Sequence, residues 1–311
     1  MLRALLISGR NVLFFLGAVT LLREAGPILG PPAIIAILLV AAAAVYWQVR
    51  ARDFRDEQVS SGLLLVLFFL LFGVLAYSRA LADQSGFTVR YDYVIELDRA
   101  LFGAVPTVWL QGQLHTEGGI NLLDVLASVI YFSYFVVPVV VGTILWHLNP
   151  TVFRLYLSTT IVMIAIGSLT FTLLPTAPPW LAGLDGYLPA VSRIAPEVAE
   201  VVRPGFYDRG YQAVGVNDVA AFPSYHTAQT LAVALVASRF GRRPAIGGAL
   251  YLAAMGFSLV YLGEHYASDV FAGIALGSFA WFAALKLTPR PVQRPAAITS
   301  PVPAEPLHRA A

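Results

Sequence analysis

The chain contains no cysteine and has few charged residues. Of its 311 residues, 12% are charged and 58% are hydrophobic, whereas a soluble domain carries about 25% charged residues. The absence of cysteine excludes disulfides, thiolate metal sites and cysteine nucleophiles. No stretch combines clustered basic residues with aromatic platforms, so we expect no nucleic-acid partner. These absences favour a membrane protein over a soluble domain.

What the sequence has instead is a series of long apolar runs, and its mean hydropathy is +0.73. Runs of about 20 apolar residues span a bilayer. The clearest predicted spans are 60–80, 122–147, 152–174, 224–240, 244–262 and 267–287. A further span is expected at 32–49, and segment 4–22 is either a span, an interfacial helix or an uncleaved signal anchor. We therefore predict an all-α, polytopic membrane helix bundle with a six-helix core and one or two extra N-terminal helices.

The predicted organisation has three parts. Residues 1–58 hold the N-terminal membrane helix or helices and a cytoplasmic loop, and residues 59–287 form the six-helix membrane domain. Two long extracytoplasmic loops, 81–121 and 175–222, interrupt that domain. The tail 288–311 is rich in proline, which cannot continue a helix, and is expected to be disordered.

The distribution of basic residues predicts the orientation. If the loop 50–59 is cytoplasmic, most of the 20 Lys and Arg residues lie inside, as the positive-inside rule requires. His226 and His265, which lie at the ends of predicted spans, then share the extracytoplasmic face. In the outer loop, 101–110 resembles a helix that lies in the interface with Trp109 at headgroup level.

The first of two short motifs lies where the 224–240 run begins. His226 follows Pro223 and Ser224, and proline is favoured in a first helical turn. The free N–H groups and positive dipole end of such a helix suit a phosphate. The structural alternative is a capped helix entrance with an interfacial histidine.

The second motif contains His265 and Asp269, four residues apart. On a helix, this spacing puts both on one face. The carboxylate can then accept the imidazole N–H and leave the other ring nitrogen as a nucleophile. The alternatives are that Asp269 is an N-terminal helix cap or that the two form a metal pair, for which the sequence offers no third ligand.

Several neighbouring residues have both structural and functional interpretations. Glu264 is either a solvated turn residue or a group that orients a hydroxyl acceptor or tunes His265. Asn217 is either a loop cap or a headgroup contact. The proline-rich turn Pro175–Trp180 ends the 152–174 span and is placed to wall a headgroup pocket. We interpret His115 as interfacial, with no partner pattern.

Together these residues resemble the type 2 phosphatidic acid phosphatase and vanadium haloperoxidase superfamily. Its Pro-Ser-x-His motif is matched by Pro223, Ser224 and His226. In its Ser-Arg-x5-His-x3-Asp motif, Ser258, His265 and Asp269 have the right spacing, but Leu259 replaces the arginine. The superfamily's Lys-x6-Arg-Pro motif is absent, because Pro196 stands where the lysine should precede Arg203-Pro204. The Pro-Pro-Trp turn and the Tyr261–Asp269 stretch are similar to fungal inositol phosphorylceramide synthase.

This resemblance implies a role for each matched residue. His265 attacks phosphorus, Asp269 orients it, and His226 protonates the departing oxygen. The family implies phosphoryl transfer without a metal or other cofactor, so cations must stabilise the phosphoryl oxygens. Ser224, Asn217 and Glu264 are candidate substrate contacts. Arg203 and Arg209 are the favoured phosphate-binding cations among the outward-facing arginines, which also include Arg79 and Arg193.

The predicted function is that of a membrane lipid phosphatase or phosphotransferase in a bacterial cell membrane, with its active site on the extracytoplasmic face. Its substrate would be a lipid-linked phosphate or phospholipid headgroup, and its acceptor water or a polyol such as inositol. The alternative is a transporter or a headgroup-binding scaffold that does no chemistry. Few ionisable residues fall at mid-membrane, which counts against transport. A vanadate-dependent peroxidase is a minor alternative.

Overall fold

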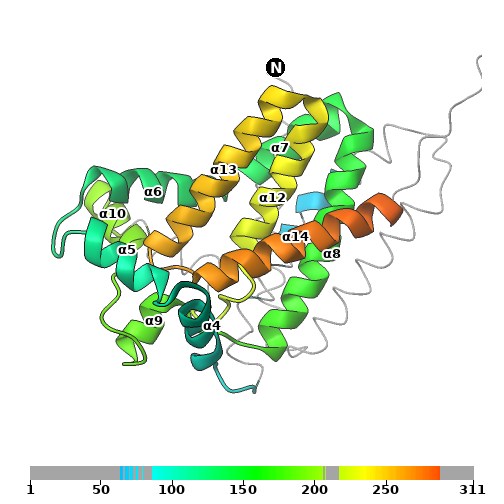
Figure 1. The fold of residues 1–311 in the computed structure, drawn as a ribbon. Helices are drawn as coiled ribbons and strands as arrows, with labels where there is room; N and C mark the ends of the chain where they lie inside the picture. The colour runs from blue at the N-terminus through cyan, green and yellow to red at the C-terminus, as the bar shows by residue number, and fades with distance from the viewer. Residues whose placement is uncertain are drawn as a thin grey trace, which may run out of the picture.

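A computed structural model of the chain describes most of the predicted membrane domain (Figure 1). The described residues are 86–205 and 217–287, with Tyr207 and separate positions between 64 and 79. The predictions made for the remaining residues lie outside this part: the spans at 4–22 and 32–49, the 1–58 segment, the 288–311 tail and Arg209.

The described part of the chain is all-α, which confirms the predicted fold class. In chain order, its elements are α4 (Asp92–Phe102), α5 (Pro106–Leu114), α6 (Leu122–Ser133), α7 (Val137–Leu148), α8 (Pro150–Leu173), α9 (Pro179–Leu184), α10 (Ile194–Val202), α12 (Tyr225–Ala237), the 3-10 turn η2 (Ser238–Phe240), α13 (Arg242–Tyr261) and α14 (Ala267–Leu287). Within these ranges, the β-type pairing consists of two isolated bridges, which join Thr176 to Arg90 and to Ala220.

Several of these helices indicate an integral membrane protein. Among the described residues, α8, α13 and α14 are long and apolar enough to cross a membrane. Helices α6 and α7 make a fourth candidate if they form one span, bent by 41° at its break. The predicted span 122–147 is therefore interrupted at 134–136. Helix α12, predicted as the span 224–240, has only 13 residues before it tightens into η2.

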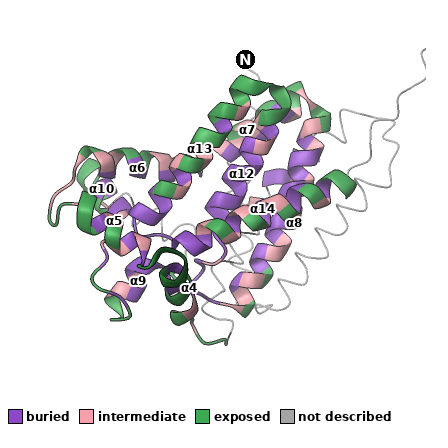
Figure 2. Cartoon of the chain, viewed as in Figure 1, coloured by how far each residue is buried: buried purple, intermediate pink, exposed green. Residues whose placement is uncertain are grey.

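The central element of the bundle is α12, which lies among α8, α13 and α14 (Figure 2). All of its first ten residues are buried. A helix buried on every side is typical of the interior of a bundle. Its polar residues are held inside as well: Gln229 donates to the Tyr156 hydroxyl at 2.6 Å. The first turn of α12, which carries His226, is thus a fixed interior position.

Two glycines let α14 pack backbone-to-backbone against α12. A Cβ on Gly273 would collide with the Ser224 carbonyl oxygen, and a Cβ on Gly277 would lie 2.9 Å from the Ala228 carbonyl oxygen. The start of α14 therefore touches the start of α12 without intervening side chains. This contact brings together the two motifs that the sequence separates.

We expect Gly273→Ala to destabilise the protein and lower its activity. The new methyl meets backbone, which cannot move aside as a side chain would, and overpacking costs typically about 1–3 kcal/mol. A fall in the thermal midpoint of the detergent-solubilised protein would show this. Gly247→Ala is the matched control, because this helical glycine faces open space and alanine is favoured there by about 1 kcal/mol. Equal midpoints for the two variants would contradict the close packing.

The shorter helices gather at the end of the bundle where α12 begins and α13 ends (Figure 1). The predicted interfacial helix at 101–110 is instead two helices, which corrects that prediction. Helix α4 ends at Phe102, Gly103 takes the left-handed conformation with φ of 75°, and α5 begins at Pro106. Glycine and proline are the usual residues at such a stop and start. Trp109, on α5, is 60% exposed.

Candidate active site

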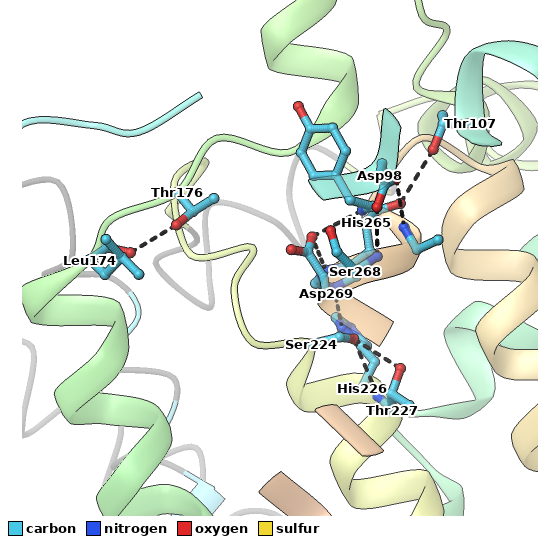
Figure 3. A network of polar contacts seen from close by, with 12 residues as sticks. Asp98, Thr107, Leu174, Thr176, Ser224, His226, Thr227, His265, Ser268 and Asp269 are labelled. Atoms are coloured by element: carbon cyan, nitrogen blue, oxygen red, sulfur yellow. Dashed lines mark hydrogen bonds and ion pairs between the residues drawn. The ribbon is translucent and has the colours of Figure 1, made fainter. Parts of the chain in front are cut away.

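Two histidines and one carboxylate meet at the start of α12 and α14 (Figure 3). His265 Nδ1 lies 3.3 Å from Asp269 Oδ2, and His265 Nε2 lies 3.2 Å from His226 Nδ1. All three side chains are buried. When Asp269 accepts the Nδ1 proton, Nε2 presents its lone pair, as a nucleophilic imidazole requires. The structure thus brings together the three residues that the two motifs predicted.

Ser224 fixes the position of His226. Its hydroxyl accepts from the Thr227 N–H at 3.3 Å and from the Thr227 hydroxyl at 3.1 Å, so it caps α12. Its own N–H donates to the Asp269 carbonyl oxygen at 3.0 Å. The two motifs are therefore joined through their backbones. Because the Ser224 side chain serves as a cap, its predicted contact with substrate stays a prediction.

Asp269 is the third residue of α14 and not its N-cap, which corrects that alternative. Its Oδ2 accepts from the Tyr266 N–H at 3.0 Å, as an acidic residue in a capping box does, and the same oxygen faces His265 Nδ1. The carboxylate is fully buried. Its position is therefore held by the start of α14 itself, and the imidazole takes its orientation from that position.

A second buried carboxylate, Asp98 on α4, holds this helix start from the opposite side. Its oxygens accept from the Ser268 N–H at 2.8 Å and from the Ala267 N–H at 3.1 Å (Figure 3). Burial raises the pKa of the Asp98 carboxyl, and the N–H donors oppose that shift. No sequence motif pointed to Asp98. The sequence shows it only as a carboxylate on the apolar face that Val94 and Ile95 form on α4.

Aromatic side chains from the bend between α6 and α7 enclose His226. The ring of Tyr134 lies 4.2 Å from the imidazole, centroid to centroid, and that of Tyr131 lies 5.3 Å away. Phe135 completes this side at 6.3 Å. No sequence motif pointed to these residues, which the sequence shows only as aromatic residues within an apolar run. They make the surroundings of His226 apolar, so polar contacts there are strong.

Glu264 forms an ion pair, which corrects its interpretation as a solvated turn residue. It is only 8% exposed, and the Arg193 Nε donates to its Oε1 at 3.0 Å. The Arg193 guanidinium also lies over the Trp180 ring, 4.2 Å from the centroid. Trp180 in turn donates its backbone N–H to the Gly263 carbonyl oxygen at 3.2 Å. The Pro-Pro-Trp turn is therefore packed against the segment that carries His265.

The other predicted substrate contacts in the described part of the chain are Asn217 and Arg203. Asn217 is buried, and its Oδ1 accepts from the Val219 N–H at 2.6 Å, which is the loop-cap role. Its Nδ2 is buried with no hydrogen-bond partner among the described residues. Arg203 is exposed where α10 ends. No group of three His, Asp or Glu side chains in the described ranges is arranged to hold a metal ion.

His115 has a partner, contrary to the sequence-based interpretation. Its Nδ1 lies 3.2 Å from Asp124 Oδ1, and the Tyr261 hydroxyl donates to the same oxygen. Asp124 also forms a capping box with Asn121 at the start of α6. This buried cluster ties α5, α6 and the end of α13 together. It therefore supports the segment that leads into the His265 turn.

Comparison with protein families identifies the superfamily of this chain. The family profile of the PAP2 superfamily matches residues 92–283, which is more than half of the chain and includes His226, His265 and Asp269. Comparison with curated proteins and with solved structures gives no significant match. The family's members act on phosphate esters, and the site of this chain holds two buried imidazoles and a carboxylate within hydrogen-bond distance of one another. The chain belongs to the PAP2 superfamily.

Proposed function

We propose that the protein is a membrane lipid phosphatase or phosphotransferase that works through a phosphohistidine intermediate. The observation that carries this proposal is the buried series Asp269, His265 and His226, connected at 3.3 and 3.2 Å. A carboxylate that fixes one ring nitrogen, with a second imidazole at the other, is the arrangement that nucleophilic and acid/base catalysis need.

The first half of the reaction transfers the phosphoryl group to the protein. His265 Nε2 attacks phosphorus, so an N–P bond forms and the bond from phosphorus to the leaving oxygen breaks. His226 gives its proton to that oxygen, which leaves as an alcohol. Asp269 stabilises the positive charge that develops on His265, because its Oδ2 faces Nδ1.

The second half releases the phosphoryl group to an acceptor. His226, now neutral, takes a proton from water or from a polyol hydroxyl while that oxygen attacks phosphorus. The N–P bond breaks, and its electron pair returns to His265. Water as acceptor gives free phosphate, and a polyol such as inositol gives a new phospho-alcohol. The protonation states of all three residues are restored.

The geometry of the site requires one local movement for phosphoryl transfer. A separation of 3.2 Å between His226 Nδ1 and His265 Nε2 is a hydrogen-bond distance. A phosphoryl group cannot fit between two atoms in direct contact. One imidazole must therefore rotate when substrate binds, and His226, enclosed by rings rather than held by a carboxylate, is the one we expect to turn.

An apolar groove beside the site supports a lipid substrate. It has a volume of about 470 Å³, lies between α13 and α14, and is lined almost wholly by apolar atoms. Thr227, which adjoins His226, and Ala267, near His265, line its inner part. Phe257 and Phe271 lie on the outer, exposed side. An acyl chain in this groove would place its attached phosphate close to the two histidines.

The same arrangement supports an active site on the extracytoplasmic face of a bacterial cell membrane. The basic cluster Arg239, Arg242 and Arg243 lies at the turn between α12 and α13, whereas the site lies at the other ends of these helices (Figure 1). If the basic turn is cytoplasmic, as the positive-inside rule favours, the site faces outward.

The contact of the Pro-Pro-Trp turn with the His265 segment favours an alcohol acceptor. Trp180 is buried, packs under Arg193 and is hydrogen-bonded to Gly263 through its backbone. The turn therefore walls the site, as its similarity to inositol phosphorylceramide synthase implies. Glu264, which is linked to Trp180 through Arg193, and Asn217 are proposed contacts for a polyol headgroup.

The test of this function is an assay of purified protein in detergent with labelled lipid phosphates and phospholipids. Free phosphate and new phospho-alcohol are both measured, with and without myo-inositol, without added metal, for wild type and His265→Ala. Phosphate release that the variant lacks establishes a phosphatase, and label on inositol establishes a transferase. If neither product forms, or if the variant equals wild type, the proposal is wrong and a headgroup-binding scaffold takes its place.

A further inference from the structure

The site lacks the cations that its superfamily motifs would supply. Leu259 stands at the arginine position of the third motif and is completely buried. Pro196 stands at the lysine position of the first motif, on α10. Phosphoryl transfer spreads negative charge over oxygens that must be stabilised by fixed positive charge. The carboxylates Glu264 and Asp269 add negative charge to the same site, so the need for cations is greater still.

Arg193 is paired with the residue that precedes the proposed nucleophile. It precedes α10, and its guanidinium binds Glu264 at 3.0 Å through Nε and at 3.4 Å through a terminal nitrogen. Glu264 is the residue immediately before His265. The Trp180 ring supports the guanidinium plane at 4.2 Å, a stabilising arrangement for arginine. A pairing and a stacking contact together fix the direction in which this side chain presents its charge.

The charge of Arg79 also acts on the site. Its guanidinium interacts electrostatically with His226 and with Tyr134, whose ring packs on His226. The Nε atom of Arg79 is buried with no hydrogen-bond partner among the described residues. A buried donor left unpaired is costly, and an anionic ligand between Arg79 and His226 would remove that cost.

Tyr131 links the two arginines in space. Arg79, Arg193 and Glu264 all interact electrostatically with its hydroxyl, and its ring lies 5.3 Å from the imidazole of His226. Both guanidinium groups therefore act on the side chain whose ring packs beside the acid/base histidine. The two charges come from segments more than 100 residues apart.

The other described basic residues of the predicted outer face do not meet these conditions. Arg90, Arg99 and Arg203 are exposed. Arg203, which the sequence favoured, lies at the C-terminal end of α10. Arg193 and Arg79 are the partly buried ones, and burial is what makes a charge effective, because water does not screen it.

We propose that Arg193 and Arg79 form the phosphate subsite of this enzyme, in place of the missing motif lysine and arginines, and that Glu264 positions Arg193. This inference rests on the proposed function. The phosphoryl oxygens bind between the two guanidinium groups while His265 Nε2 forms its bond to phosphorus and the leaving oxygen takes the proton of His226. Arg193 and Arg79 transfer no proton and stabilise the charge of the transferring group.

The experiment measures binding of inorganic orthovanadate, a phosphate mimic, to the full-length protein in detergent by calorimetry, together with turnover. Single charge-assisted hydrogen bonds are worth about 1.5–3 kcal/mol, which corresponds to a loss of affinity of about 10- to 150-fold. We expect that loss in Arg79→Gln and in the double variant Arg193→Gln with Glu264→Gln. The double variant is used because removal of Arg193 alone would leave Glu264 buried and unpaired.

The controls separate this inference from the proposed function. Arg99→Gln removes an exposed arginine of α4 and should bind vanadate as wild type does. If Arg203→Gln or Arg209→Gln loses affinity while the Arg79 and Arg193/Glu264 variants bind normally, the subsite assignment is overturned. If wild type turns over substrate in a His265-dependent way but all arginine variants bind vanadate equally, the function stands and this inference fails. Wild type that neither binds vanadate nor turns over would overturn both.

Discussion

Replacement of His265 by alanine is expected to abolish turnover, with a loss of about 10⁴-fold or more in kcat. His265 is the only protein group in the proposed mechanism that forms a bond to phosphorus. Its Nδ1 is 3.3 Å from Asp269 Oδ2, which leaves Nε2 as the reacting atom. Loss of a covalent nucleophile removes both chemical steps at once.

The measurement combines steady-state rates with a chemical trap. Wild type is mixed with a substrate labelled in the phosphoryl group and quenched in alkali, which preserves phosphohistidine, whereas acid destroys it. We expect label on wild-type protein and none on His265→Ala. His147→Ala is the control, because His147 is exposed at the end of α7. Label retained on the His265 variant would place the nucleophile elsewhere.

The parts of the site that the sequence predicted are those set by local spacing. His265 and Asp269 lie four residues apart, so a single helix start brings them within 3.3 Å. Ser224 caps the helix on which His226 follows two residues later. The apolar runs likewise predicted α8, α13 and α14 to within a few residues, because the thickness of a bilayer dictates their length and composition.

The parts that the sequence did not predict depend on contacts between distant segments. Asp98 bonds to Ser268 across a sequence separation of 170 residues, and no local pattern reports such a pairing. The sequence leaves Glu264 open between a solvated turn residue and a functional group, because its partner, Arg193, is 71 residues away. Charge alone suggests exposure, but an ion pair stacked on Trp180 stays buried.

Some misses had a signal in the sequence itself. Gly103 and Pro106 interrupt the predicted interfacial helix at 101–110, and the structure ends α4 and begins α5 at these residues. His115 pairs with Asp124 only nine residues later. Asn121, three residues before Asp124, forms a capping box with it at the start of α6. These local patterns predict helix boundaries. They do not predict that the Asp124 carboxylate also accepts a hydrogen bond from the Tyr261 hydroxyl.

Replacement of His226 by alanine should have a smaller effect that depends on the leaving group. His226 Nδ1 lies 3.2 Å from His265 Nε2, close enough to reach the oxygen that leaves when phosphorus binds between them. General acid catalysis contributes typically about 10²–10⁴-fold. We expect a loss of that size for a lipid phosphate, whose alkoxide leaves poorly. A p-nitrophenyl ester, whose phenolate leaves without protonation, should be affected much less in the phosphorylation step.

The pH dependence distinguishes this role from a structural one. A general acid must be protonated to act, so phosphorylation by wild type should slow as pH rises, and His226→Ala should lose that dependence. Tyr131 and Tyr134 enclose the imidazole in apolar surroundings, so the variant must first be shown to keep the wild-type thermal midpoint. In His226→Ala, phosphohistidine should still form, but slowly. It should also persist longer than in wild type, because His226 activates the acceptor in the second step. Equal residual activity in His226→Ala and His265→Ala, whatever the leaving group, would contradict the division of roles, since a nucleophile cannot be bypassed by a better leaving group and a proton donor can.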